Sequence, residues 1–576
     1  MKTKERNKMK KSLYLIRIIM ILLAVAAFSQ SCTKLDEKLY SEITPDNFFQ
    51  NDAQFVSALG AAYTKLGNYA SQEVYQLNEL TTDEMVTPTR GSDWDDGGNW
   101  RRLHLHSWKF EDNAVGAAWD FGYTGINTAN RLIYQVGQNV TKGLLAQATA
   151  DVYVAELKSL RAFFYWQLVD LYGNVPLVTD FTSTDAAPAN KTRLEVYNFI
   201  VGDLEASAPL LSKAVDGTTY GRMNYWAAKF LLAKLYLNAG VYTSVVDISG
   251  SQITAGTPQW TKAIAACDEI INSGKFSLES NYFTNFTVND AGSTEFIFAI
   301  PYDQVFFQGF QMGTQTLHYA SQGTYNFTQQ PWNGFCTLEQ FYNSYSDNDL
   351  RKGDAGTLAG PAKKRGNFIA GYQYLSTGAP AIDAGADGAD PDGTKLNLGS
   401  IGDGVPQINS LGPQCWRQSG VRIGKWEFAQ GSDPGNLSND LAVFRYADVL
   451  LMKAEAQWRN TGDAADGTSL TLVNQIRERA GLTDLSSLDG KLSFDLAGSV
   501  VPGGELFNEM GREMFAEHNR RQDLIRWGFF NSNDKWVLPF ANAGDVLKTT
   551  GDYLRVFPIG KSKLAANPNL KQNPKY

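Results

Sequence analysis

The sequence predicts a mostly α-helical protein: a body of packed helical hairpins that carries an irregular, loop-rich part with short strands. Three observations lead to this fold class. Apolar residues recur at helical spacing through most of residues 52–282. Two pairs of neighbouring helical segments have the pattern of antiparallel hairpins. Between these pairs, residues 283–440 lose the helical periodicity and are rich in Gly, Asn, Asp and Pro.

The chain begins with the pattern of an export signal. Basic residues are frequent up to Arg17, and an apolar run follows at residues 18–28. This run is shorter than the ~20 residues that span a bilayer. Small and polar residues then lead to Cys32, an order that resembles a bacterial lipobox, although Ser29 stands where Leu is usual. We therefore expect a lipoprotein signal peptide over residues 1–31 and acylation of Cys32, with a nearby cleavage site and an incidental cysteine as the alternative.

Helical periodicity starts at residue 52. The segment 52–69 repeats apolar positions at helical spacing, and Asn51 or Asp52 can cap it. The same spacing returns in the segments 115–137, 151–172 and 193–212. Residues 78–113 lack it and contain three tryptophans. Because disordered segments are poor in tryptophan, this long polar loop is interpreted as functional.

Two pairs of segments are predicted to form helical hairpins. These pairs are 222–241 with 260–273, and 440–458 with 467–480. In the first pair, Ala228 and Leu232 share a stripe that faces Ala263 and Cys267, and small residues of this kind allow close approach of two helices. The length and the Ala, Leu and Tyr pattern resemble a tetratricopeptide hairpin, a unit of ~34 residues. The predicted body is therefore tetratricopeptide-like, though without a regular repeat.

The central region combines strand-like fragments with loops. Residues 295–303, EFIFAIPYD, have the composition of a strand. Residues 383–404 are acidic and rich in glycine and are expected to form an irregular loop. Their carboxylates could bind calcium, but the spacing is not that of an EF-hand loop, and a solvated loop is the favoured interpretation.

Composition limits the function classes. The chain of 576 residues is 43% hydrophobic, enough for a large core, and carries a net charge of −8. An acidic balance argues against a nucleic-acid partner, which needs a concentrated basic surface.

The cysteines give little information about disulfides or metal sites. With Cys32 acylated, three cysteines remain, an odd number. Cys267 lies in a helical pattern and is expected to be buried. A bridge between Cys336 and Cys415 is left open. The sequence contains no CxxC motif, so it does not suggest a structural zinc site.

Charged residues in the C-terminal half are expected to be structural. Arg445, Asp448 and Glu455 are placed on one predicted helix, and residues 512–523 form a second, charge-rich one. An ion-pair network within the protein or a solvated face explains them better than chemistry does.

Several segments, in order from residue 32 to residue 576, resemble the SusD/RagB family of outer-membrane nutrient-binding lipoproteins. They include AELKSLRAFFYWQLVDLYGNVPLV, SNDLAVFRYADVLLMKAEAQWRNTG, GREMFAEHNRRQDLIRWG and FPIGKSKLAANPNLKQNPKY. The resemblance implies four tetratricopeptide-like units, with an N-terminal helical region over 32–282 and a C-terminal region over 283–576. It also implies glycan capture at the cell surface, without a cofactor, beside a SusC-like TonB-dependent transporter of the outer membrane.

Two polar loops carry residues suited to binding a sugar. A sugar ring stacks its C–H-rich face on an aromatic ring, and its hydroxyls bond to Asn, Asp or Arg. The candidate carbohydrate-binding residues are Arg90, Asp93, Trp94, Asn99 and Trp100 in the first loop and Tyr325, Trp332 and Asn333 in the second. Gly97 and Gly98 allow the backbone to turn and bring two indoles together. Packing of the loop against the body is the alternative for each tryptophan.

No catalytic motif accompanies these residues. A glycosidase needs two carboxylates ~5–9.5 Å apart across the sugar, and the neighbouring Asp93, Asp95 and Asp96 predict no such pair. The four histidines form no HExxH motif, and no GxSxG motif or phosphate-binding loop is present. The sequence thus predicts a non-catalytic glycan-binding lipoprotein. A surface glycoside hydrolase, and a transporter lid for a non-glycan nutrient such as a peptide, are the alternatives.

Overall fold

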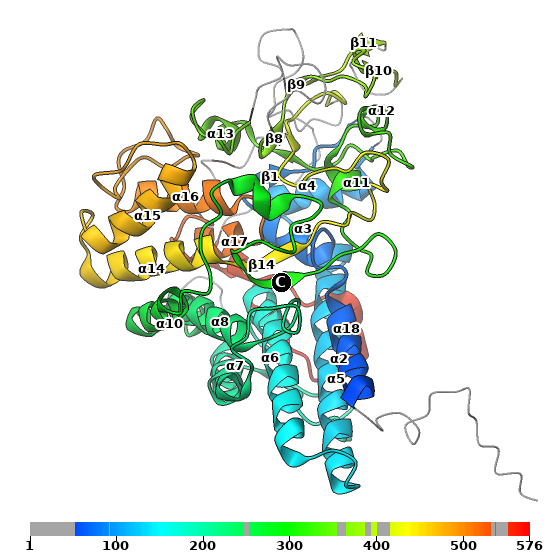
Figure 1. Cartoon of the computed structure of the whole chain (residues 1–576), viewed down its shortest axis with the longest axis vertical. Helices are drawn as coiled ribbons and strands as arrows, with labels where there is room; N and C mark the ends of the chain where they lie inside the picture. Colours follow the sequence, from blue (N-terminus) through cyan, green and yellow to red (C-terminus); the bar gives the residue numbers. More distant parts are fainter. Residues whose placement is uncertain are drawn as a thin grey trace, which may run out of the picture. The chain divides into compact units, whose positions relative to one another are not determined.

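The structure is a computed structural model that describes residues 52–90, 93–246, 253–353, 365–385, 393–399, 415–531, 536 and 551–576. Residues 55–576 form one compact unit, and most of its elements are helices (Figure 1). The boundary expected between residues 282 and 283 falls inside this unit. The expected signal peptide and Cys32, and much of the acidic segment 383–404, lie outside the described residues.

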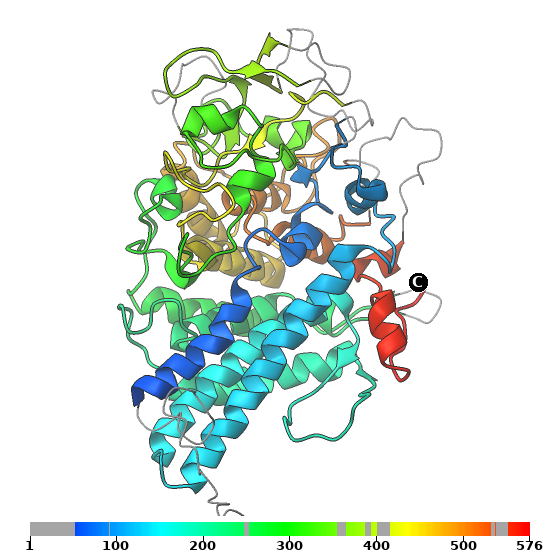
Figure 2. The same cartoon turned by 90° about the vertical axis from the view of Figure 1, so that its right-hand side faces the viewer.

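The first helices pack as long antiparallel neighbours. After α2 (Asp52–Tyr63), α5 (Asn113–Thr141) and α6 (Gln147–Tyr172) lie side by side, as Figures 1 and 2 show. Gly122 allows this contact, because a Cβ there would lie 2.5 Å from Leu168 Cγ. The helix α7 (Arg193–Ser207) also packs against α6. The helices α5 and α6 are long, but none of the described helices has the run of apolar residues needed to cross a membrane.

The two predicted hairpins are present and stack on each other. They consist of α8 (Tyr225–Leu237) with α10 (Trp260–Asn272), and of α14 (Tyr446–Thr461) with α15 (Gly467–Arg479). In space, α10 packs against both α8 and α14, so the hairpins form one continuous stack although they are distant in sequence. Ala263 and Cys267 are fully buried on α10, as expected for small interface residues. The mostly helical, tetratricopeptide-like fold class is confirmed.

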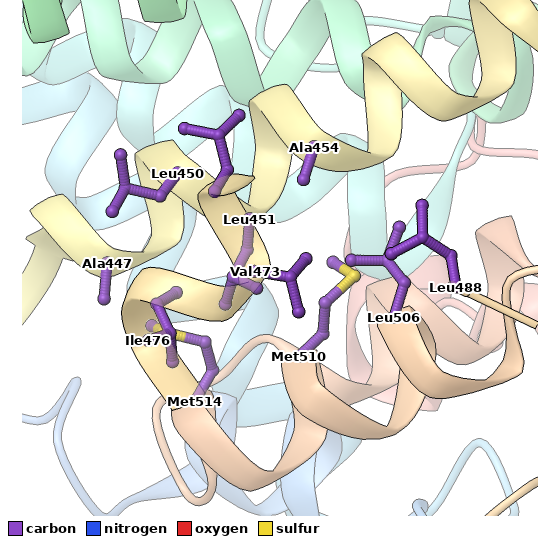
Figure 3. Packing of buried hydrophobic residues seen from close by; sticks show 11 residues of the cluster. Ala447, Leu450, Leu451, Ala454, Val473, Ile476, Leu488, Leu506, Met510 and Met514 are labelled. Atoms are coloured by element: carbon purple, nitrogen blue, oxygen red, sulfur yellow. The ribbon is translucent and has the colours of Figure 1, made fainter. Parts of the chain in front are cut away.

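An apolar cluster joins the second hairpin to α16 (Gly504–Met514) (Figure 3). Leu450 and Leu451 of α14, Ile476 of α15 and Met510 of α16 are at most 2% exposed. Complete burial of one such side chain is worth ~1.5–3 kcal/mol. This cluster holds the C-terminal helices against the hairpin stack.

Strands are short and pair in twos. The strand predicted at 295–303 is β6 (Phe296–Ile300), which pairs antiparallel with β14 (Leu441–Arg445). For the site the important pair is β1 (Met85–Val86) with β7 (Cys336–Thr337), in which Val86 lies opposite Cys336. The other pairs are β2 (Val175–Pro176) with β3 (Asn190–Lys191), β4 (Val245–Val246) with β5 (Ile253–Thr254), β8 (Phe368–Ile369) with β13 (Arg422–Ile423), β9 (Gly371–Tyr372) with β12 (Asn397–Leu398), and β10 (Ile382–Asp383) with β11 (Thr394–Lys395).

Short helices connect these elements. They are α3 (Glu73–Glu79), α4 (Asn99–His104), α9 (Ala239–Tyr242), α11 (Met312–Thr316), α12 (Ser321–Tyr325), α13 (Glu339–Asn343), α17 (Arg520–Arg526) and α18 (Lys561–Ala566). The long loop expected at 78–113 therefore contains α4 and β1. The last described segment, 551–576, returns to the first helices, where the Phe557 N–H donates to the Leu171 carbonyl at 2.7 Å.

The charge-rich segment 512–523 differs from the prediction of a single helix. It is divided between α16 and α17 by a turn in which Ala516 and His518 have φ values of 63° and 67°. Arg445 likewise ends β14 and precedes α14 instead of lying within that helix.

These charges form an ion-pair network inside the protein and not a solvated face. The fully buried Arg445 guanidinium lies 2.9 Å from Glu295, 2.7 Å from Glu513 and 2.8 Å from Glu517. Arg445 and two further arginines, Arg479 and Arg351, hold the pKa of Glu513 down to about 2 against the opposing effect of burial.

The disulfide left open between Cys336 and Cys415 does not form. Both residues, like Cys267, are buried thiols. The Cys336 sulfur lies 3.8 Å from Arg90 Nη2, and burial raises the pKa of this thiol. The two loops that these cysteines occupy are held together by hydrogen bonds and packing alone.

Candidate functional site

A cavity of about 900 Å³ lies between α3, α4, α11 and the start of α5. Figure 1 shows α3, α4 and α11 near one another, although residues 73–79 and 312–316 are far apart in sequence. The β1–β7 pair explains this arrangement, because it fixes the loop that follows β1 beside the loop that precedes β7. These are the two loops that carry the predicted aromatic residues.

Three tryptophans form one wall of the cavity. The ring centroids of Trp94 and Trp100 are 4.9 Å apart with the planes at 67°, and those of Trp94 and Trp332 are 6.5 Å apart. Trp332 is 50% exposed, and the other two are partly buried. Gly97 and Gly98 adopt φ values of 62° and 80°, so the turn expected between the first two indoles is present.

The indole N–H groups are used to fix the rings. Trp94 Nε1 donates to the Trp332 carbonyl at 2.6 Å, and Trp100 Nε1 donates to Asp96 Oδ2 at 2.6 Å. Gly334 makes room for Trp94, since a Cβ at that position would lie 2.3 Å from Trp94 Cζ2. A ligand in the cavity would therefore meet the ring faces of these two tryptophans and not their polar edges.

Side-chain amides line the rest of the cavity. Gln76 lies in α3, Gln315 in α11 and Asn99 in α4, and Gln72 and Gln311 are the residues that directly precede α3 and α11. Gln72 Nε2 donates to Gln311 Oε1 and so links the two helices. The oxygens Gln315 Oε1 and Asn99 Oδ1 are buried and, within the described residues, accept no hydrogen bond. Buried acceptors of this kind can take hydroxyl donors of a ligand.

Sequence reasoning found Asn99 but missed the four glutamines. Gln72 and Gln76 are four residues apart, and so are Gln311 and Gln315. This spacing places both members of a pair on one helical face and was the available signal.

Two charged residues of the cavity, Arg102 and Asp112, form an ion pair. Arg102 Nε donates to Asp112 Oδ2 at 3.1 Å, and Arg102 Nη1 donates to the Gly97 carbonyl at 2.6 Å. Asp112 Oδ2 also accepts the Lys109 backbone N–H at 2.8 Å. Across the described residues, no group of three or more His, Cys, Asp or Glu side chains is arranged to hold a metal ion. The residues 386–392 and 400–404 of the alternative calcium loop lie outside that search.

Arg90 and Asn333, both candidates from the sequence, do not line the cavity. The Arg90 guanidinium is fully buried and donates to the carbonyls of Asn333 at 2.5 Å, Gly334 at 3.1 Å and Ser419 at 3.0 Å. Asn333 is buried too, and its Nδ2 donates to the Arg417 carbonyl at 3.0 Å. Both side chains stabilise the two aromatic loops through buried hydrogen bonds to backbone carbonyls.

Asp93 and Tyr325 also lie away from the three indoles. Asp93 accepts a hydrogen bond from the Tyr319 hydroxyl and lines a neighbouring, smaller cavity. Tyr325 stacks on Phe327 at 5.0 Å and packs against Phe428 at 5.4 Å, and burial raises its pKa to about 12. Of the candidate residues, the structure thus brings together Trp94, Asn99, Trp100 and Trp332.

Comparison with known proteins gives the family. A profile of the SusD family matches residues 294–576, and a second profile, described as starch-binding associating with outer membrane, matches residues 35–237. The chain belongs to the SusD family. Starch-binding protein SusD of Bacteroides thetaiotaomicron is 25% identical to it over 521 residues, which cover 87% of this chain and 85% of that protein. A SusD-like protein of Bacteroides ovatus is 23% identical over 537 residues, covering 91% of this chain and 84% of that protein.

Solved structures of other SusD-like proteins have the same fold. A SusD superfamily protein from Parabacteroides distasonis superposes with a TM-score of 0.66 at 19% identity, covering 93% of this chain and 100% of that one. Surface glycan-binding protein A from Bacteroides thetaiotaomicron, solved in complex with laminarihexaose, gives a TM-score of 0.64 at 20% identity, covering 91% of this chain and 99% of that one. The SusD-like fold thus covers more than nine-tenths of this chain.

Proposed function

We propose that this chain is a non-catalytic, cell-surface glycan-binding lipoprotein that captures oligosaccharides or polysaccharides. The observation that carries the proposal is the wall of Trp94, Trp100 and Trp332 beside a set of amide side chains in a cavity of about 900 Å³. Stacking faces next to hydrogen-bonding groups match the two kinds of surface on a sugar ring. The relative named starch-binding protein and the solved complex with laminarihexaose support the ligand class.

Delivery of the glycan to a SusC-like TonB-dependent transporter is the second part of the proposal. The second family profile is described as associating with the outer membrane, and a lipid-anchored protein on that surface is not itself a channel. A tethered binding protein therefore needs a channel partner. Affinity purification from membranes solubilised in mild detergent should recover a large TonB-dependent β-barrel, and recovery of this chain alone would contradict the partnership.

A glycan array with the purified protein, followed by incubation with every glycan that binds, tests the ligand class and the absence of catalysis together. We expect binding without new reducing ends. Two cavity carboxylates already have structural roles, since Asp96 fixes Trp100 and Asp112 fixes Arg102. New reducing ends would favour the glycoside hydrolase alternative. Silence across the array, with binding of peptides, would favour a transporter lid for another nutrient.

A further inference from the structure

A second cavity, of about 380 Å³, is lined in part by residues that neighbour those of the first cavity in sequence. Asp93 lines the second cavity, whereas its neighbour Trp94 lines the first. The other loop repeats this division, because Gln330 lines the second cavity and Trp332 the first. The two aromatic loops thus contribute residues to both cavities; we call the stretch of these loops between the cavities, which includes the half-exposed Trp332, the ridge.

A buried histidine offers a hydrogen-bond donor to the second cavity. The backbone N–H of Ala320 donates to His318 Nδ1 at 3.1 Å, so Nδ1 carries no proton. Burial lowers the pKa of His318 to about 4, which leaves the ring neutral at neutral pH with its proton on Nε2. This Nε2 is buried and has no hydrogen-bond partner among the described residues.

The carboxylate of Asp383 is too far from His318 Nε2 for a direct hydrogen bond. His318 Nε2 lies 3.6 Å from Asp383 Oδ1, beyond the range of a hydrogen bond. A hydroxyl group can accept from Nε2–H and donate to a carboxylate at the same time, which neither an ammonium nor a carboxylate ligand can do. The exposed Gln330 adds an amide to the same wall.

The charges around the cavity favour a neutral ligand. Asp93 and Asp383 contribute carboxylates, and Arg417 contributes a guanidinium that lies 5.0 Å from the centroid of the Tyr319 ring. Arg417 Nη1 lies 3.9 Å from Asp383 Oδ1, so these two charges pair with each other, and the remaining carboxylate of Asp93 disfavours an anionic sugar. An uncharged polyol meets no like charge.

We propose that the second cavity is a further saccharide subsite, in which His318, Asp383 and Gln330 bind a hydroxyl-rich, uncharged unit of the glycan that crosses the ridge from the tryptophan cavity. This inference rests on the proposed glycan-binding function. It predicts that ligands long enough to reach both cavities gain affinity from the second, and that short ligands do not.

Two histidine variants separate the donor from the packing of the ring. His318→Asn keeps an acceptor near the position of Nδ1 for the Ala320 N–H but removes the Nε2–H donor. His318→Gln places an amide donor near the position of Nε2 and serves as the matched control. Gln330→Ala changes an exposed side chain and leaves the fold intact, so it covers the case in which a histidine variant is unstable.

The probes are laminarihexaose and maltohexaose, with laminaribiose and maltose as the short ligands, titrated by calorimetry or tryptophan fluorescence. For the hexasaccharide that binds, His318→Asn and Gln330→Ala should each lower affinity about three- to tenfold, and His318→Gln should lose less. The affinity for the short ligand should not change in these variants. Trp332→Ala should weaken both ligands.

The outcomes separate the two proposals. If Trp332→Ala weakens binding while His318→Asn and Gln330→Ala leave hexasaccharide affinity at the wild-type value, the glycan site stands and the second cavity is not a subsite. If His318→Asn weakens the short ligand equally, the effect is transmitted through the ridge and the subsite is also rejected. If the wild-type protein binds neither hexasaccharide, the same variants are compared on the longest and the shortest glycan that the array identifies, and silence across the array rejects the proposed function and the subsite together.

Discussion

Single residues at the cavity differ in how much of their role is binding and how much is support. Trp332 is half exposed, whereas Trp94 donates a hydrogen bond and packs against Gly334 and Phe335. A ring that stacks on a ligand and touches little else can be removed without unfolding the loop. Removal of a ring that also holds the loop in place destabilises the loop.

We therefore expect Trp332→Ala to lower glycan affinity about tenfold, a loss of ~1.4 kcal/mol, with little change in the thermal midpoint. Trp94→Ala should lower affinity and also reduce the free energy of unfolding by on the order of 2 kcal/mol, because it opens a hole beside Phe335. Calorimetric titration measures the glycan affinity of each variant, and thermal melts measure its stability. Phe306→Ala is the control, since Phe306 is 91% exposed and does not line the cavity. Full affinity in both tryptophan variants would place the site elsewhere.

Gly334 tests the fit between the two loops. Replacing it by Ala puts a Cβ 2.3 Å from Trp94 Cζ2 and 2.7 Å from the Gln315 carbonyl, and the second of these atoms is backbone. Overpacking of this kind costs ~1–3 kcal/mol, and we expect Gly334→Ala to lower the free energy of unfolding by that amount and to weaken glycan binding. Denaturant titration checks the first effect. The control is Gly137→Ala on α5, where a Cβ would meet nothing within 4 Å; equal stability of the two variants would show that the loops yield easily.

At the scale of elements, α3 connects the cavity to the buried core. Glu73 and Gln76 of this helix, and Gln72 just before it, line the cavity. Its last residue, Glu79, is fully buried and accepts the His518 backbone N–H at 2.6 Å in the turn between α16 and α17. Burial raises the pKa of Glu79 to about 8, so this carboxyl is protonated in the folded protein at neutral pH.

This pKa shift predicts a dependence of stability on pH. Because the folded-state pKa lies above the unfolded value near 4.5, the contribution of Glu79 is complete below pH 4.5 and is lost between about pH 4.5 and 8. Glu79→Gln keeps an acceptor for the His518 N–H and cannot ionise. Relative to wild type it should become more stable as the pH rises through this window, by up to ~1.4 kcal/mol per pH unit.

Unfolding in denaturant at several pH values between 5 and 8 checks this expectation. Glu73→Gln, on the same helix but only partly buried, is the control and should follow the wild-type curve. Parallel curves for wild type and Glu79→Gln would mean that Glu79 is ionised in the folded protein.

At the scale of the whole molecule, the proposed function includes a lipid anchor at Cys32. Cys32 follows a short apolar run and lies 20 residues before the start of α2 at Asp52. We expect Cys32→Ala to leave the protein unacylated and to release it from the membrane fraction, because attachment would depend on the lipid. Fractionation and immunoblotting measure this, and Ser31→Ala, which keeps a small residue before the cysteine, should stay with the membrane. A Cys32→Ala protein that remains in the membrane fraction would show that something other than the lipid holds it.

The sequence by itself determined the helical class, the two hairpins and the strand at 295–303, because each depends on a local period or composition. It also determined the family, through motifs spread along the chain, and it identified the aromatic loops around Trp94 and Trp332. Local pattern could not show that 512–523 breaks into two helices. There the buried ion pairs of Glu513 and Glu517 and the left-handed residues Ala516 and His518 override helical propensity.

Only the tertiary structure decided which candidate residues meet. The β1–β7 pair joins segments about 250 residues apart and so sets Trp94 against Trp332. The same packing buries Arg90 beneath the loops and directs Asp93 into the second cavity. Residue type alone could not predict these positions, because a polar loop residue can face solvent, a ligand or a backbone carbonyl. Which of the three it faces is set by partners that are distant in sequence.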